Sequence, residues 1–163
     1  MTSLGELGES GLLEAIRPSL AVAGKDLLVG PGEDDAAAWR EPEGVLVATS
    51  DAFVEGVHFD RRWLRPAEIG WRCLALALGD LACKGAAPSQ ALVCLALTPG
   101  WSVEEVTELY SGIAALAGRT GPALVGGDLV ASPHEAVVCI TALGRARWPV
   151  VPRSAARPGW KVA

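Results

Sequence analysis

Short segments of this chain repeatedly end at aspartates that stand among glycines or other small residues, and this pattern restricts how the chain can fold. The motifs are GPGEDDAA, ATSDAFVEGVHF, ALGDLACKGA and LVGGDL, which contain Asp34, Asp35, Asp51, Asp80 and Asp128. Mg²⁺ prefers oxygen ligands, takes few carboxylates from the protein, and completes its shell with water and substrate phosphates. Carboxylates spaced in this way are typical of one metal–phosphate site, so we expect the fold to bring these segments together.

The apolar periodicity predicts an α+β fold in which helices cover a mixed β-sheet. Helices are expected over residues 5–20, 66–84 and 102–118, and strands over 25–29, 45–50, 91–97, 123–125 and 137–143. Pro66 suits the first position of the second helix, and Ser102 with Glu105 forms a capping-box pattern at the start of the third. A loop is expected from Asp51 to Leu64. The 163 residues contain no repeat or long linker, so we expect one domain.

Composition excludes several classes of function. The chain has 14 basic and 19 acidic residues, a net charge of −5, and no basic cluster, which argues against nucleic-acid binding. The N-terminus lacks the basic region of a secretion signal, and Asp80 and Lys84 interrupt the longest apolar run. We therefore expect no membrane span and a cytoplasmic location. The four cysteines lack CxxC spacing and lie in apolar segments, which predicts buried reduced thiols.

Two of the acidic motifs each have a structural alternative. The residues Gly126-Gly127-Asp128 could bring backbone amides to a phosphate and a carboxylate to a cation, or could form a tight turn after a buried strand. Asp34 and Asp35 could hold a metal, because adjacent carboxylates repel each other, or could mark an acidic surface turn. Neither motif decides the function by itself.

The other candidate residues differ in how strongly they indicate a site. Asp51 could bind a metal with oxygen atoms of Thr49 and Ser50, or could cap the loop that follows. Asp80 has small and apolar neighbours, and a charge in that setting needs a partner, which favours a functional role. His58 lies in the loop after Asp51, where a lone histidine is more often simply exposed. Arg153 could meet an anionic ligand, although most arginines are surface residues.

Taken together, these motifs resemble the N-terminal half of the thiamine-monophosphate kinase family. This family belongs to the superfamily of aminoimidazole ribonucleotide synthetase, selenophosphate synthetase and a hydrogenase-maturation protein. The resemblance spans about residues 4–158 and rests on LGELGESGLL, VGPGEDDAA, TSDAFVEGVHF, IGWRCLALALGDLACKGAAP, ALVGGD and RSAARPG. The first cysteine, Cys73, is too late for a selenophosphate synthetase, and TSDAFVEGVHF replaces the DGVGTK-like segment of the purine enzyme.

The resemblance implies ligands and partners for this chain. It implies Mg²⁺ ligands at Asp34, Asp35, Thr49, Ser50, Asp51, Asp80 and Asp128. It also implies contacts of Gly127, Asp128 and Arg153 with ATP, and a place for His58 at the thiamine phosphate. Members of the family transfer the γ-phosphoryl group of ATP to thiamine monophosphate, and they are homodimers that pair their N-terminal sheets. Phosphoryl transfer needs positioning and charge neutralisation, so no protein nucleophile is required.

The chain also departs from the family pattern. Glu33 precedes the paired aspartates, Leu129-Val130-Ala131 follows Asp128 in place of Thr-Thr-Arg, and Lys84 replaces an apolar residue. The family's C-terminal domain is absent from the 163 residues. We therefore expect residues 1–163 to form one ATP- and Mg²⁺-binding N-terminal domain. It would be either a kinase half that works with a C-terminal domain, which a separate gene could encode, or a non-catalytic dimerisation or nucleotide-binding remnant.

Overall fold

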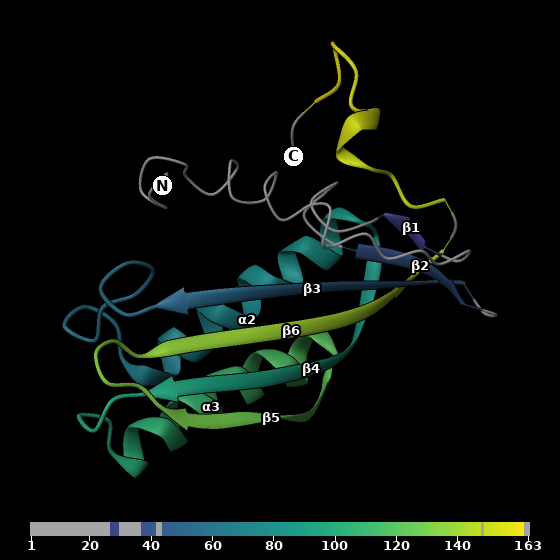
Figure 1. The fold of residues 1–163 in the computed structure, drawn as a ribbon. Helices are drawn as coiled ribbons and strands as arrows, with labels where there is room; N and C mark the ends of the chain where they lie inside the picture. Colours follow the sequence, from purple (N-terminus) through teal and green to yellow (C-terminus); the bar gives the residue numbers. More distant parts are fainter. Residues whose placement is uncertain (1–26, 30–36, 42–43, 148, 162–163) are drawn as a thin grey trace, which may run out of the picture.

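The computed structural model describes residues 27–29, 37–41, 44–147 and 149–161, in which a six-stranded sheet is packed against two long helices (Figure 1). The elements are β1 (Leu27–Val29), β2 (Ala37–Glu41), β3 (Gly44–Val54), α2 (Pro66–Cys83), β4 (Ala86–Leu97), α3 (Val103–Thr120), β5 (Ala123–Ala131), β6 (Val137–Ala146) and the short 3₁₀ helix η2 (Arg153–Ala155). The strand order is β1-β2-β3-β6-β4-β5. Only β4 and β5 are parallel neighbours, so the sheet is mixed and the expected α+β class is confirmed.

Both described helices begin where the sequence predicts. Pro66 is the first residue of α2, where its missing N–H costs no helical hydrogen bond. At the start of α3, the Glu105 amide donates to Ser102 Oγ at 3.2 Å, and the Ser102 amide donates to Glu105 Oε2 at 2.8 Å. This reciprocal capping satisfies two backbone donors that the helix leaves unpaired. Neither described helix combines the length and apolarity that a membrane span requires.

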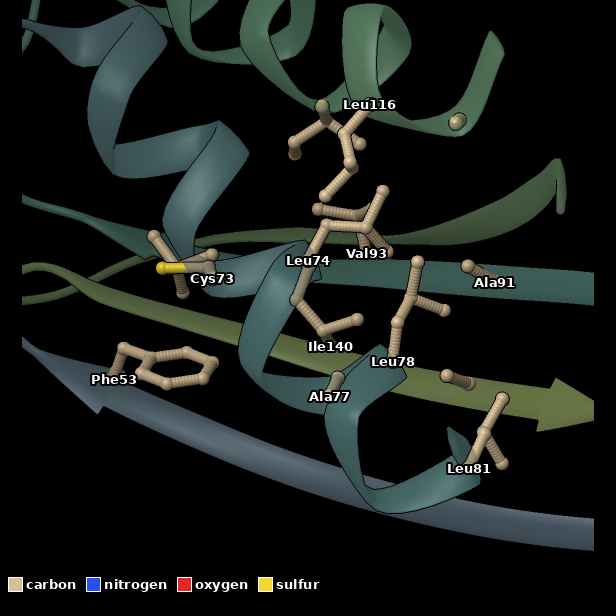
Figure 2. Close-up of a cluster of buried hydrophobic side chains, with 14 of the residues drawn as sticks. Phe53, Cys73, Leu74, Ala77, Leu78, Leu81, Ala91, Val93, Leu116 and Ile140 are labelled. Carbon is tan, nitrogen blue, oxygen red and sulfur yellow. The ribbon is translucent and has the colours of Figure 1, made fainter. Parts of the chain in front are cut away.

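The two helices lie on the same face of the sheet (Figure 1). The apolar residues of α2 recur every three or four positions, and Leu74, Leu78 and Leu81 point toward the strands, where Ile140 and Val93 meet them (Figure 2). Along β6, alternate residues are buried, as expected for a strand with one covered face. We call the face that α2 and α3 cover the helix face, and the opposite one the open face.

Several strand boundaries differ from the prediction. β3 does not end at Ser50 but continues to Val54, because β6 pairs with it without interruption from Val45 to Val54. β4 begins at Ala86 and includes Pro88, next to an irregularity in its pairing with β6. The pattern of the sequence missed β2 entirely. The predicted helix over residues 5–20 lies outside the described residues.

The interpretation of the cysteines as uniformly buried was wrong in part. Cys73 is buried against the sheet, whereas Cys139 is half-buried and Cys83 and Cys94 are exposed, all as free thiols. Cys94 is exposed because it alternates along β4 with residues that face the helices. An apolar run in sequence therefore concealed a strand with one open face.

Candidate functional site

Thr49 and Asp80 form the contact at the centre of the candidate site. Thr49 lies on β3 and is 7% exposed, and its Oγ1 donates to Asp80 Oδ2 of α2 at 2.8 Å. Only α2, packed across β3, brings these two residues together, since they are 31 positions apart. The hydroxyl offsets part of the desolvation of the carboxylate. The sequence predicted that the charge of Asp80 needs a partner, and the structure shows that this partner is the hydroxyl of Thr49. A hydroxyl is neutral, so it does not cancel the negative charge of the carboxylate.

Asp51 lies on the same side of β3 as Thr49. The pairing of β3 with β6 is continuous between them, so side chains two residues apart point to the same face. Asp51 is half-buried and interacts with other protein groups. Asp51, Thr49 and Asp80 therefore supply hydroxyl and carboxylate oxygens to the helix face. This donor type suits a hard cation such as Mg²⁺.

Ser50 points to the open face, away from Thr49. Its hydroxyl lies 2.9 Å from Thr141 Oγ1 and 3.6 Å from Cys139 Sγ, both on the neighbouring strand β6. Adjacent residues of a strand point to opposite sides of the sheet. A metal bound at the side chains of both Thr49 and Ser50 is therefore inconsistent with this strand geometry, although backbone oxygens remain available as ligands.

Asp128 is exposed on β5, which extends beyond the predicted strand over residues 123–125 to Ala131. Its Oδ1 accepts a hydrogen bond from the Leu129 amide at 2.8 Å. It pairs with Cys94 of β4, whose neighbours Val93 and Leu95 are buried under the helices. This register places Asp128 on the open face, so its convergence with Asp80 stays a prediction.

Gly127 has a structural role in the same motif. Its φ is 154°, and an added Cβ would overlap the backbone carbonyl of Val93 on the adjacent strand. Only glycine fits this approach of β5 to β4. The two glycines thus lie inside a strand that is exposed along its whole length, and the interpretation of a turn after a buried strand was wrong.

His58 lies in a tight turn directly after β3. Its Nδ1 accepts a hydrogen bond from the Val54 amide at 3.0 Å, and its ring meets Phe53 edge-on at 6.1 Å between centroids. The His58 amide donates back to the Val54 carbonyl at 2.8 Å. Because Nδ1 accepts, the neutral imidazole carries its proton on Nε2. The exposed ring is therefore held in one orientation with a donor on its other nitrogen.

Arg61 fixes this turn to the segment that connects β4 with α3. Its Nε donates to Glu55 Oε1 at 2.7 Å, its Nη1 donates to the Gly100 carbonyl at 3.1 Å and to Glu105 Oε1 at 3.2 Å, and its guanidinium lies 4.7 Å from the centre of a Trp101 ring. The hydrogen bond to Glu55 is the main reason why the pKa of Arg61 is raised. The sequence analysis missed this cluster, because its members are distant along the chain and belong to no local pattern.

The remaining predicted residues are Arg153, Asp34 and Asp35. Arg153 is exposed on η2 and interacts with other protein groups. Asp34 and Asp35 lie outside the described residues. Within the described part of the chain, no three side chains of the His, Cys, Asp or Glu type are arranged to hold a metal. Among the predicted metal ligands, the structure joins Thr49 to Asp80.

Comparisons with known proteins agree with this architecture. A family model described as AIR synthase related protein, N-terminal domain, matches residues 33–146. The thiamine-monophosphate kinase of Synechococcus elongatus is 38% identical over 143 residues, which cover 87% of this chain and 41% of the relative. That of Bacillus subtilis is 34% identical over 139 residues, covering 85% and 42%.

A solved structure, "AaThiL complexed with AMPPCP and TMP", superposes with a TM-score of 0.84 at 29% identity. The superposition covers 96% of this chain and 48% of that one. The chain thus spans less than half the length of these relatives. The resemblance drawn from the motifs is confirmed: the chain belongs to the AIR synthase related family, and it corresponds to that family's N-terminal domain.

Proposed function

We propose that this chain is the ATP- and Mg²⁺-binding N-terminal domain of a thiamine-monophosphate kinase, which converts thiamine monophosphate to thiamine diphosphate. The observation that carries the proposal is the match to AaThiL complexed with AMPPCP and TMP, which extends over 96% of this chain. AMPPCP stands in for ATP in that structure. The sequence relatives with the kinase name support the same reaction.

The oxygen donors of β3 and α2 would hold the metal. Asp51, Asp80 and Thr49 fit this role because they present hard oxygen ligands from one side of the sheet. We also assign Asp34, Asp35, Ser50 and Asp128 to the metal site: Ser50 would contribute its backbone carbonyl oxygen, because its side chain points to the open face, and Asp128 would reach the metal from the open face of a second copy of the chain. Bound Mg²⁺ would neutralise phosphate charge and align the two substrates. The hydrogen bond from Thr49 would hold one oxygen of Asp80 in place and leave the other available.

His58 would bind the phosphate of thiamine monophosphate. Its Nδ1 is occupied by the Val54 amide, so Nε2 is the nitrogen that would donate to a phosphate oxygen. The Arg61 cluster would keep this donor in position by fixing the turn. On the nucleotide side, Arg153, Gly127 and Asp128 would contact ATP, because a guanidinium and backbone amides both suit phosphate oxygens.

The assembly and location are parts of the same proposal. The exposed open face of the sheet would pair with a second copy in a homodimer, and a C-terminal domain, supplied by the same or a separate chain, would complete the substrate pocket. Residues 1–163 would then be one domain of a two-domain enzyme. We place the reaction in the cytoplasm, where ATP is available.

Calorimetric titration with Mg·ATP tests the metal site directly. We expect saturable binding by the wild-type chain and at least about tenfold weaker binding by Asp80→Asn and Asp128→Asn, a loss of about 1.4 kcal/mol each. Asp60→Asn is the matched control, because the Asp60 carboxylate accepts hydrogen bonds from Arg62 in the loop before α2. Equal binding by the wild type and all three variants would refute the site.

A non-catalytic role is the alternative function. The position of Asp128 on the open face, opposite Thr49 and Asp80, favours it, because a single copy then presents its carboxylates on two sides of the sheet. Such a chain would dimerise or bind nucleotide without turnover. A coupled assay in which the chain alone forms thiamine diphosphate from ATP and thiamine monophosphate would exclude this alternative.

A further inference from the structure

Two of the four cysteines lie directly opposite each other on neighbouring strands. Cys94 of β4 pairs with Cys139 of β6 in the antiparallel register. The next pair along the two strands, Val93 and Ile140, is buried and lies beside Leu74 of α2 (Figure 2). Because adjacent residues of a strand point to opposite sides of the sheet, both cysteine side chains lie on the open face. The exposure of Cys94 and the partial exposure of Cys139 agree with this placement.

The contact with Ser50 shows where the sulfur of Cys139 lies. Ser50 is exposed on the open face, and its Oγ is 3.6 Å from Cys139 Sγ. The sulfur of Cys139 is therefore on the open face, on the strand next to the exposed Cys94. Both cysteines are free thiols in the structure.

The backbone geometry of the pair suits a disulfide bond. The Glu55 amide donates to the Ala136 carbonyl at 2.8 Å and continues the register of β3 with β6 by one residue. Backbone groups alternate in direction along a strand, so those of Cys139, three residues later, face β4. Cys94 and Cys139 are thus a hydrogen-bonded pair, in which the Cα atoms are about 5.5 Å apart. This is close to the commonest Cα separation in disulfides, about 5.5–6 Å.

The side chains must approach each other slightly for this bond to form. The Cβ atoms of directly opposite residues are about 4.5–5.5 Å apart, and a disulfide brings them to about 3.5–4.5 Å. Closing this gap strains the bond and makes it easier to reduce. A disulfide at this position is therefore reversible. Reversibility suits a cytoplasmic protein, because disulfides in that compartment are usually transient or redox-sensing.

We propose that Cys94 and Cys139 form a reversible cross-strand disulfide in the presence of a low-molecular-weight disulfide such as oxidised glutathione. The thiolate of Cys94, the more exposed of the two, attacks one sulfur of oxidised glutathione, breaks its S–S bond and releases one glutathione thiolate. The Cys139 thiolate then attacks Cys94 Sγ in this mixed disulfide and releases the second glutathione. The cysteines lose two protons and two electrons, which convert oxidised glutathione into two molecules of the thiol. Because a homodimer of the proposed kind would cover the open face, the bond would form before the chain assembles.

Peptide mapping after treatment with glutathione tests the proposal. The 163-residue chain is equilibrated with oxidised and reduced glutathione, quenched with acid, treated with N-ethylmaleimide in denaturant and digested with trypsin. Trypsin separates Cys94, in residues 85–119, from Cys139, in residues 120–145, and both from Cys73 and Cys83, in residues 73–84. We expect peptides 85–119 and 120–145 to be linked in the monomeric chain and to separate on addition of dithiothreitol. This link should be at least about tenfold more abundant than any other, because only this pair of thiols is held within reach.

Variants and unfolding show whether the fold selects this pair. Cys94→Ser and Cys139→Ser should each abolish the link, whereas Cys83→Ser is the matched control and should retain it, because Cys83 is exposed at the end of α2. In urea, where the strand register is lost, the preference for the pair should disappear. The proposal is overturned if the pair stays unlinked while Cys83 takes up glutathione. It is also overturned if Cys94 links equally to Cys83, or if the link joins only two separate chains.

The same mapping separates this disulfide from the proposed kinase site. Asp128 pairs with Cys94 on its other side, and Asp128→Asn should retain the link although it changes a proposed metal ligand. Loss of the link in Asp128→Asn would contradict selection by the register of β4 and β6. Failure of Mg·ATP binding would affect only the kinase proposal, because neither cysteine is assigned to that site.

Discussion

Gly112 of α3 lies directly against the backbone carbonyl of Ala67 in α2, with no room for a side chain between them. An added Cβ would overlap the Ala67 oxygen, and Gly70 makes the reciprocal close approach to the Leu109 carbonyl. These two glycines allow the helices to pack closely enough for both to cover the sheet. The distance between α2 and α3 is therefore set by residues that have no side chain.

Replacing Gly112 by Ala should destabilise the protein. Alanine favours the helix by about 1 kcal/mol, but forcing apart two packed helices costs about 3 kcal/mol, so we expect a net loss of about 2 kcal/mol. Gly118→Ala on the same helix is the control, because an added Cβ there meets no atom within 4 Å. Urea unfolding should show a lower midpoint for Gly112→Ala and an equal or higher one for Gly118→Ala. A stabilised Gly112→Ala would contradict the close packing.

Thr49→Val should destabilise the protein through Asp80. The change keeps the shape of the side chain but removes the hydroxyl that donates to Asp80 Oδ2, so the carboxylate loses a partner at a cost of about 1–3 kcal/mol. Thr49→Ser retains the hydroxyl and should recover most of this loss. Urea unfolding measures the free energy of unfolding of the two variants. Equal stability of Thr49→Val and Thr49→Ser would show that the hydrogen bond does not contribute to stability.

Much of the helical architecture follows from local sequence signals. Pro66 and the pair Ser102–Glu105 determine where α2 and α3 begin, because a proline at the first position and a capping box act within one turn. Such signals need no distant partner, and they were read correctly. The same holds for the covered face of α2, whose apolar spacing is visible in the sequence.

The ends of the strands and the geometry of the site could not be predicted in this way. β3 extends past Asp51 because β6, about 90 residues later, supplies its pairing partner. In the sequence, Gly127 is consistent with a turn, whereas in the structure it allows β5 to approach the backbone of Val93 closely. The aspartates were recognised as a group, whereas the face to which each one points depends on strand register. Register is a property of the assembled sheet.

Cys73 should resist alkylation in the folded protein. Burial raises the pKa of its thiol from an ordinary value of 9.0 to about 12, and the thiolate is the reactive form. At pH 8, iodoacetamide should therefore modify the exposed Cys83 and Cys94 first, and Cys73 only after denaturant is added. Mass spectrometry of the tryptic peptides measures this order. Modification of Cys73 at the rate of Cys83 in the native protein would contradict its burial.

The same shift makes stability depend on pH in the alkaline range. Below pH 9.0, the Cys73 thiol is protonated in both the folded and the unfolded chain, so its contribution to stability is fully present. Between pH 9.0 and about 12, the unfolded chain loses this proton while the folded one retains it, and the free energy of unfolding falls. Cys73→Ala should show a smaller decline over this range in denaturant titrations. An identical decline in both proteins would assign it to other groups.

Arg61→Gln should loosen the turn that carries His58. The substitution removes the guanidinium that joins Glu55, the Gly100 carbonyl and Glu105, and we expect a loss of about 1–2 kcal/mol because the cluster is partly exposed. The amides of Gly56 and His58, which bond within the turn, should exchange with solvent faster. Hydrogen exchange measured by NMR resolves these amides individually.

Arg62→Gln is the matched control for this effect, because the Arg62 side chain is exposed and its described contacts are with Asp60, outside the cluster. Its removal should leave the exchange of the Gly56 and His58 amides unchanged. If His58 binds the thiamine phosphate, Arg61→Gln should also raise KM for thiamine monophosphate more than it lowers kcat in the complete enzyme, since the residue positions a binding group and touches no reacting atom. Equal protection of these amides in Arg61→Gln and Arg62→Gln would show that the turn holds His58 without the cluster.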